Sequence, residues 1–185
     1  RVHPSRHTHS GIADLRRAIR QGARAVVAVG GDGTNNEVVN GFFDEDGHRL
    51  AGNTAFGVVT SGTGGDFRRT FGWPADPLSD LERLARGVVR RIDVGRARFA
   101  TREGGEAARY FVNIGSFGIS GRIVDTVNRS SKALGARTSF IAGTLRNLVG
   151  YRPQRVRVTC DDGPPQDLDI TVVAVANGQY FGGGM

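Results

Sequence analysis

The spacing of apolar residues in the first half of the chain alternates between the period of a helix and that of a buried strand. Apolar residues recur every three or four positions near the start, which predicts an amphipathic helix over residues 12–21. Two short apolar runs, 25–29 and 55–60, each lead into a glycine-rich turn and predict buried strands of the parallel type. Further helices are expected over 36–43, 66–71 and 78–86. This alternation is typical of an α/β layer.

The second half of the chain has a different pattern, in which strand-like segments dominate. Arg155 and Arg157 alternate with Val156 and Val158, which predicts a strand with one solvated face. We expect strands and helices over these ranges: strands at 88–94, 110–114, 155–160 and 169–176, and helices near 119–128 and 138–149. We therefore place a domain boundary after residue 90, with an α/β domain over 1–90 and a β-rich domain over 91–185.

The composition excludes several classes of protein. Lys132 is the only lysine among 25 lysine and arginine residues, and it lies in Ser-Ser-Lys-Ala, which excludes a P-loop. Cys160 is the only cysteine, which excludes an intrachain disulfide and fits a reducing cytoplasm. No apolar stretch approaches the ~20 residues of a membrane span, so any membrane contact is expected to be peripheral, at the inner face. The formal net charge of +7 favours acidic partners such as a nucleotide or an anionic lipid.

Two turns of similar composition carry the candidate chemistry. Residues 29–37 read Val-Gly-Gly-Asp-Gly-Thr-Asn-Asn-Glu, and residues 60–67 read Thr-Ser-Gly-Thr-Gly-Gly-Asp-Phe. Each turn follows a predicted strand, leads into a predicted helix and holds an acid three residues after a threonine. A capping box, in which threonine and acid satisfy each other's backbone N–H groups, would explain the threonine and the acid. The surrounding glycines favour a second interpretation, in which bare backbone N–H groups bind phosphate.

Asp32, the acid within the first turn, limits which phosphate-containing ligands the turn could bind. Asp32 would repel phosphates unless a divalent cation lay between them, which favours a metal-bound nucleoside triphosphate. The Rossmann dinucleotide site is the competing interpretation. Neither Gly31-x-Gly33 nor Gly62-x-Gly64 has the third glycine of that fingerprint.

These residues resemble the diacylglycerol kinase catalytic domain family, the group of bacterial lipid kinases and sphingosine kinases within the NAD kinase-like superfamily. The string Gly-Gly-Asp-Gly-Thr-x-Asn-Glu-Val-x-Asn-Gly over 30–41 carries the resemblance, and residues 61–67 resemble the second loop of the family. Residues 91–95, 110–118 and 176–185 resemble later segments in the same order. Gly65 stands where the family usually has asparagine, and Thr60 where it usually has proline.

The resemblance implies an α/β nucleotide-binding domain followed by a β-sandwich-like domain, with ATP and Mg²⁺ as cofactors. It implies catalytic roles for Asp32 and Asp93, with Asp93 near the magnesium and the transferred phosphoryl group. Glu37 and Asp66 would orient the two loops. The residues implied to bind the nucleotide are Gly30, Gly31, Asp32, Gly33, Thr34, Asn36, Glu37, Gly62, Thr63 and Asp66. No metal site formed by side chains alone is predicted, because His3, His7 and His9 are interpreted as part of a solvated terminus.

The expected activity is transfer of the γ-phosphoryl group of ATP to a lipid hydroxyl, most simply from diacylglycerol to phosphatidic acid. The alternatives are an NAD kinase and a nucleotide-binding protein without turnover. The resemblance implies a further strand before Arg1 and, after Met185, an Asp-Gly segment with the general base and a structural magnesium loop. The expected partners are ATP and a lipid at a membrane surface, without nucleic acid, and a homodimer is left open.

Overall fold

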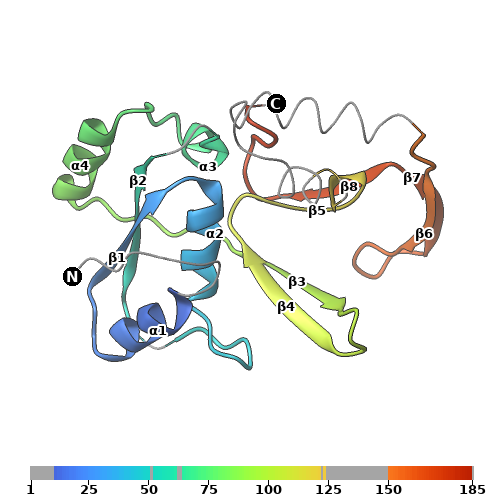
Figure 1. Cartoon of the computed structure of the whole chain (residues 1–185), viewed down its shortest axis with the longest axis horizontal. Helices are drawn as coiled ribbons and strands as arrows, with labels where there is room; N and C mark the ends of the chain where they lie inside the picture. Colours follow the sequence, from blue (N-terminus) through green and yellow to red (C-terminus); the bar gives the residue numbers. More distant parts are fainter. Residues whose placement is uncertain (1–10, 51, 62–63, 122, 124–149, 185) are drawn as a thin grey trace. The chain divides into compact units, whose positions relative to one another are not determined.

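A computed structural model describes residues 11–50, 52–61, 64–121, 123 and 150–184 (Figure 1). The chain forms two compact units. The first unit consists of Arg1–Ile114 and Ala176–Met185, and the second of Gly115–Val175. These units are defined by contacts in space, and the sequence boundary that we placed after residue 90 stays a prediction.

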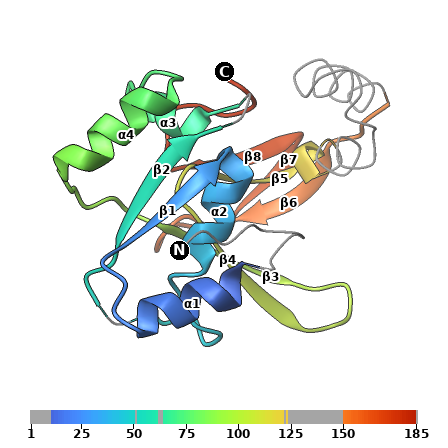
Figure 2. The same ribbon diagram turned by 60° about the vertical axis from the view of Figure 1, so that its left-hand side comes forward.

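The first unit is built around a pair of parallel strands flanked by helices (Figures 1 and 2). β1 and β2 pair in register from Ala25↔Ala55 to Gly30↔Thr60, so both strands end at the same edge. Helix α2 contacts both β1 and the later strand β4. The elements in chain order are α1 (Ile12–Arg20), β1 (Ala25–Gly30), α2 (Asp32–Asn40), β2 (Ala55–Thr60), α3 (Asp66–Thr70), α4 (Pro77–Arg86), β3 (Gly95–Ala100) and β4 (Glu106–Phe111).

Three of the expected elements in this unit are wrong in their bounds. The strand expected over 110–114 spans a break, because β4 ends at Phe111, residues 112 and 113 form a bend, and the next strand begins at Ile114. Helix α2 begins at Asp32 instead of residue 36, because Gly31 is its extended N-cap and the following residues already form its first turn. The strand expected over 88–94 is absent from the described residues, where this exposed stretch is irregular and β3 begins only at Gly95. The remaining helices and β2 lie within two residues of their expected bounds.

Strand β1 is parallel as expected, but it is not buried on both faces. Its burial alternates along the strand, with Ala28 buried while Val27 is 43% and Val29 is 64% exposed. A wholly apolar run hides this alternation, because period-two burial leaves no trace in a sequence without polar positions. The expectation of a fully buried β1 is therefore wrong.

An apolar cluster among the described residues joins the elements that lead into and out of the two glycine-rich turns. Its buried members are Val39, Val58, Phe67, Tyr110 and Val112, from α2, β2, α3, β4 and the residue after β4. The Tyr110 ring stacks on Phe43 with ring centroids 3.6 Å apart. Since burial of apolar area is the main favourable term in folding, this cluster fixes both helix N-termini relative to the strands.

Side chains of α4 and α2 complete the outer edges of two strands. The Asp80 carboxylate is fully buried and accepts a hydrogen bond from Thr60 N–H at 2.6 Å, while Arg83 donates to the Val58 carbonyl at 3.0 Å. Ser61 N–H instead donates to the Gly30 carbonyl of β1 at 3.0 Å, so α4 covers the edge of β2 that β1 leaves free. On β4, the Asn40 amide of α2 likewise donates to the Tyr110 carbonyl and accepts from Tyr110 N–H.

The second unit contains short antiparallel pairing. β6 (Gln154–Val158) and β7 (Gln166–Ile170) pair antiparallel, and β5 (Ile114–Gly118) pairs with β8 (Val172–Ala176). The single strand expected over 169–176 is wrong, because the chain makes two strands that break at Thr171 and belong to different sheets. Residues 119–121 are helical as expected, whereas 124–128 and 138–149 lie outside the described residues.

Candidate active site

The first glycine-rich turn places the free N-terminus of a helix directly after a strand. β1 ends at Gly30, Gly31 is extended, and α2 starts at Asp32. The first intrahelical bond runs from Asn35 N–H to the Gly31 carbonyl, so the three preceding N–H groups have no partner among the described residues. A Cβ at Gly33 would meet nothing within 4 Å. This arrangement of open backbone donors suits an anionic ligand.

The capping-box interpretation fails for this helix. Thr34 lies inside the first turn of α2 and makes no cap hydrogen bond. A Cβ at Gly30 would overlap the Thr34 hydroxyl group, so the threonine occupies the space that the glycine leaves. Glycine at position 30 is therefore required for the close approach of strand and helix.

The carboxylate of Asp32 ties the first turn to the second. Its Oδ2 accepts from Asp66 N–H at 3.0 Å, and its Oδ1 accepts from Phe67 N–H at 3.1 Å. These are the first N–H groups of α3, which otherwise has Gly65 at its N-cap with φ of 72°. A carboxylate at a helix N-terminus also interacts favourably with the helix dipole. Asp32, the first residue of α2, thus caps the N-terminus of α3.

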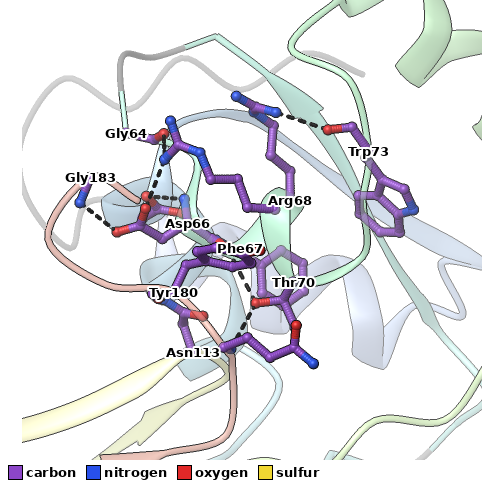
Figure 3. Close-up of polar contacts among 12 residues, drawn as sticks. Gly64, Asp66, Phe67, Arg68, Thr70, Trp73, Asn113, Tyr180 and Gly183 are labelled. Carbon is purple, nitrogen blue, oxygen red and sulfur yellow. Dashed lines mark hydrogen bonds and ion pairs between the residues drawn. The ribbon is translucent and has the colours of Figure 1, made fainter. Parts of the chain in front are cut away.

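Asp66 continues this connection toward a third segment (Figure 3). The Asp66 side chain is 9% exposed, and its Oδ1 accepts from Arg69 at 2.8 Å while its Oδ2 accepts from Gly183 N–H at 2.9 Å. Arg69 also donates to the Gly64 carbonyl at 2.7 Å. The arginine therefore braces the end of the second glycine-rich turn, and its neighbour Arg68 donates to the Trp73 carbonyl instead.

Asp93 differs from the other two acids. Its backbone carbonyl accepts a hydrogen bond from Asn177 at 2.7 Å. Its side chain is exposed and forms no hydrogen bond or ion pair within the described part of the chain. The carboxylates of Asp32 and Asp66 are engaged by donors, whereas that of Asp93 is available to a ligand.

The structure brings some of the expected site residues together and leaves others apart. Asp32 and Asp66 are directly linked, and Gly30, Gly31, Gly33 and Thr34 form one turn with Asp32. Asn36 is exposed and Glu37 half-buried on α2. Gly62 and Thr63 lie outside the described residues. No described contact joins Asp93 to the two glycine-rich turns directly.

Sequence reasoning missed several residues that hold this site. Asn40, Thr70 and Asn177 make side-chain hydrogen bonds that connect segments far apart in the chain. Both asparagines precede a glycine, in Asn40-Gly41 and Asn177-Gly178, and both lie within segments already noted for their resemblance to the family. The dipeptide Asn-Gly, present in both segments, is thus the signal that could have pointed to the two asparagines.

A second group of polar side chains lies in the loop after α2. Ligand atoms of Asp44, Asp46 and His48 all lie within 4.8 Å of one another. Asp44 accepts from the backbone N–H of His48 at 2.7 Å, and this hydrogen bond holds the pKa of the Asp44 carboxyl below its ordinary value. The contacts of Asp44 close the loop on itself, and this group contains none of the expected site residues.

Comparison with known proteins identifies the family. The "Diacylglycerol kinase catalytic domain" family matches residues 1–97, and the "YegS C-terminal NAD kinase beta sandwich-like domain" matches residues 113–185. These two matches define the class of protein, an α/β catalytic domain followed by a β-sandwich-like domain, as the sequence predicted. The chain belongs to the diacylglycerol kinase catalytic domain family.

Individual relatives agree with this assignment. The chain is 31% identical over 177 residues to the "Probable lipid kinase YegS-like" of Chromohalobacter salexigens, covering 94% of this chain and 52% of that protein. It is 32% identical over 138 residues to the "Diacylglycerol kinase" of Bacillus subtilis, covering 74% and 41%. A crystal structure of a diacylglycerol kinase from Bacillus anthracis superposes with a TM-score of 0.64 at 20% identity, covering 97% of this chain and 53% of that one. The chain thus spans about half the length of these relatives.

The described helices bear on membrane contact in one respect. Among the residues that the structure describes, no helix combines the length and the apolar character needed to cross a bilayer.

Proposed function

We propose that this chain forms the nucleotide site of an ATP- and Mg²⁺-dependent lipid kinase whose acceptor is a lipid hydroxyl, with diacylglycerol as the first candidate and phosphatidic acid as its product. The observation that carries the proposal is the Asp32 carboxylate, which links a helix N-terminus with free N–H groups to the second glycine-rich turn. Membership of the family and the names of the relatives support the choice of reaction.

The residues present fit a nucleotide phosphate. The first turn of α2 offers backbone N–H groups without partners among the described residues, and the open space at Gly33 lets a phosphate approach the backbone. This proposal retains the expected nucleotide contacts, which are Gly30, Gly31, Asp32, Gly33, Thr34, Asn36, Glu37, Gly62, Thr63 and Asp66.

The carboxylates also fit a divalent cation. Hard cations prefer carboxylate oxygens, and Asp93 has an exposed carboxylate with no described partner. When bound, Mg²⁺ would neutralise negative charge on the phosphates. Asp32 and Asp66 hold the turns in place, since their oxygens already accept backbone and guanidinium donors.

The reaction itself is an in-line displacement at the γ-phosphorus. The acceptor hydroxyl loses its proton to a carboxylate, its oxygen bonds to the γ-phosphorus, and the bond to the β,γ-bridging oxygen breaks to release ADP. The N–H groups of α2 stabilise the charge on the phosphate oxygens, because they are fixed before the substrate arrives.

The test is phosphate transfer from γ-labelled ATP, with Mg²⁺, to a panel of diacylglycerol, sphingosine, phosphatidylglycerol and NAD, using the protein as its gene encodes it. A labelled lipid supports the proposal and names the acceptor. Labelled NAD would instead favour an NAD kinase. ATP binding without any labelled acceptor would overturn the proposal in favour of a nucleotide-binding protein without turnover.

A matched pair of variants tests the role of Asp32. Asp32→Asn should abolish transfer and weaken Mg²⁺–ATP binding more than binding of ATP without metal. The amide has one acceptor oxygen in place of two for Asp66 N–H and Phe67 N–H, and it lacks the negative charge that favours a cation beside the phosphates. Asp162→Asn removes the same charge from an exposed turn and should leave transfer unchanged. Equal activity of wild type and Asp32→Asn would refute the role assigned to Asp32.

A further inference from the structure

The segment that follows β8 is bound to the turn after β4 by a closed set of hydrogen bonds. Asn177 N–H and Gly178 N–H both donate to the Asn113 carbonyl, at 2.8 and 2.7 Å. In return, the Asn113 side chain donates to the Tyr180 carbonyl at 2.7 Å. We call residues 177–183 the strap. All these residues belong to the first compact unit.

The strap also lies against helix α3 (Figure 3). Gln179 N–H donates to the Thr70 hydroxyl at 3.1 Å, and Gly183 N–H donates to the Asp66 carboxylate at 2.9 Å. A Cβ at Gly178 would overlap the Asn113 side-chain oxygen and lie 2.9 Å from Thr70 Oγ1, so only glycine allows this approach. The strap is therefore attached at two points to the helix that the second glycine-rich turn leads into.

The first residue of the strap holds the backbone of Asp93. The Asn177 side-chain amide donates to the Asp93 carbonyl at 2.7 Å and to the Val112 carbonyl at 3.1 Å. A primary amide has two N–H groups, so both are used. Asp93 lies in the irregular stretch before β3, where no strand ladder fixes the backbone. Asn177 supplies the restraint that a ladder would give.

These contacts form one continuous connection from Asp93 to Asp32. It runs from the Asp93 carbonyl to Asn177, along the strap to Gly183, through the Asp66 carboxylate, and from Asp66 N–H to the Asp32 carboxylate. The connection holds the backbone of Asp93 and leaves its carboxylate exposed. A group that must meet a metal ion or a proton needs this combination, a fixed position with free ligand atoms.

We propose that Asn177 is a positioning residue of the phosphoryl-transfer site, which sets Asp93 at a fixed place relative to the second glycine-rich turn through the strap. This inference rests on the proposed function for its catalytic consequence. Its structural content, that Asn177 immobilises the stretch before β3, does not depend on which reaction the protein performs.

The test uses two variants of Asn177 in the protein as its gene encodes it. Asn177→Asp keeps the shape of the side chain but replaces the NH₂ group that makes both donations with an acceptor oxygen. Asn177→Ala removes the donors without adding charge. If Asn177→Asp does not fold, Asn177→Ala carries the test. Asn53→Asp is the control, since Asn53 is an exposed asparagine with no described hydrogen bond from its side chain.

The first readout separates turnover from nucleotide binding. Both variants of Asn177 should lower kcat by about 10- to 100-fold, because a small displacement of a reacting group has effects of this size. The KM for ATP should stay within about threefold, since the nucleotide contacts lie on the glycine-rich turns and an unchanged KM marks an effect confined to the chemical step. Unchanged kcat, or kcat and KM worsening together with thermal stability, would overturn the proposal.

The second readout is hydrogen–deuterium exchange of the peptide covering residues 88–95. Exchange should become faster in both variants of Asn177 and stay unchanged in the Asn53 control. If wild-type protein transfers phosphate to no acceptor, the proposed function fails, and exchange alone decides the inference. Faster exchange then supports the strap as the restraint on Asp93, and unchanged exchange overturns it.

Discussion

Asn40→Ala should destabilise the protein strongly, because this buried side chain satisfies the backbone of a strand. Asn40 is 9% exposed, and its amide donates to the Tyr110 carbonyl at 2.8 Å and accepts from Tyr110 N–H at 2.9 Å. It also donates to the Asn36 carbonyl at 2.8 Å. Tyr110 itself is 7% exposed, so water does not readily replace the lost partner.

The size of the effect follows from the groups left without partners. Each buried donor or acceptor that loses its hydrogen bond costs about 1–3 kcal/mol, and alanine leaves two such groups on Tyr110. We expect a loss of about 3 kcal/mol in the free energy of unfolding. For a chain of this length, each kcal/mol corresponds to about 2–4 °C in Tm, so Tm should fall by about 6–12 °C.

The assay is urea unfolding of wild type, Asn40→Ala and a control, Asn53→Ala. The control removes an exposed asparagine amide and should change the free energy of unfolding by less than about 0.5 kcal/mol. A loss below about 1 kcal/mol in Asn40→Ala would refute the reasoning, because it would mean that Tyr110 finds other partners or was never held by the amide.

Three further predictions concern the same unit. Gly178→Ala should lower Tm and slow turnover, because the new Cβ would overlap an asparagine side chain in the turn after β4; calorimetry and the transfer assay check this, and a wild-type Tm would contradict it. Asp80→Asn should cost about 2 kcal/mol in urea unfolding, because it removes the charge of a fully buried carboxylate that pairs at 2.6 Å with Arg83, whose side chain is 25% exposed. A loss under about 1 kcal/mol would count against that pair. The pKa of Asp76 is lowered by hydrogen bonds from Ser79, so its stabilisation of α4 is present above the unfolded pKa and lost as pH falls through the lower folded pKa. Urea midpoints of wild type and Asp76→Asn should therefore converge on acidification below about pH 4, and a constant difference would disprove the linkage.

The sequence predicted those parts of the fold that depend on neighbouring residues. Apolar periodicity located α1, β2 and α4. Glycine content and position between a predicted strand and a predicted helix located both glycine-rich turns. The start of α2 was missed because Asp32-Gly33-Thr34 has low helix propensity, and position after a strand outweighed that propensity.

The site's internal connections could not be predicted in the same way. The cap of α3 comes from Asp32, 34 positions earlier in the chain, and the restraint on Asp93 comes from Asn177, 84 positions later. Local rules for capping expected a threonine and an acid within one turn. Contacts of this separation depend on how the apolar core packs, which no local pattern encodes.

The side chains that cover the outer edges of β2 and β4 have a consequence for self-association. An uncovered edge offers a row of N–H and C=O groups with which another molecule can pair and begin to aggregate. Here Asp80 accepts from Thr60 N–H and Arg83 donates to the Val58 carbonyl, both in β2. In β4, the Asn40 amide bonds both the N–H and the carbonyl of Tyr110. At these positions side chains, in place of a neighbouring strand, occupy the backbone groups of β2 and β4 and prevent them from pairing with another molecule. Colloidal stability in a concentrated solution thus depends on Asp80, Arg83 and Asn40, which are distinct from the acids that hold the glycine-rich turns.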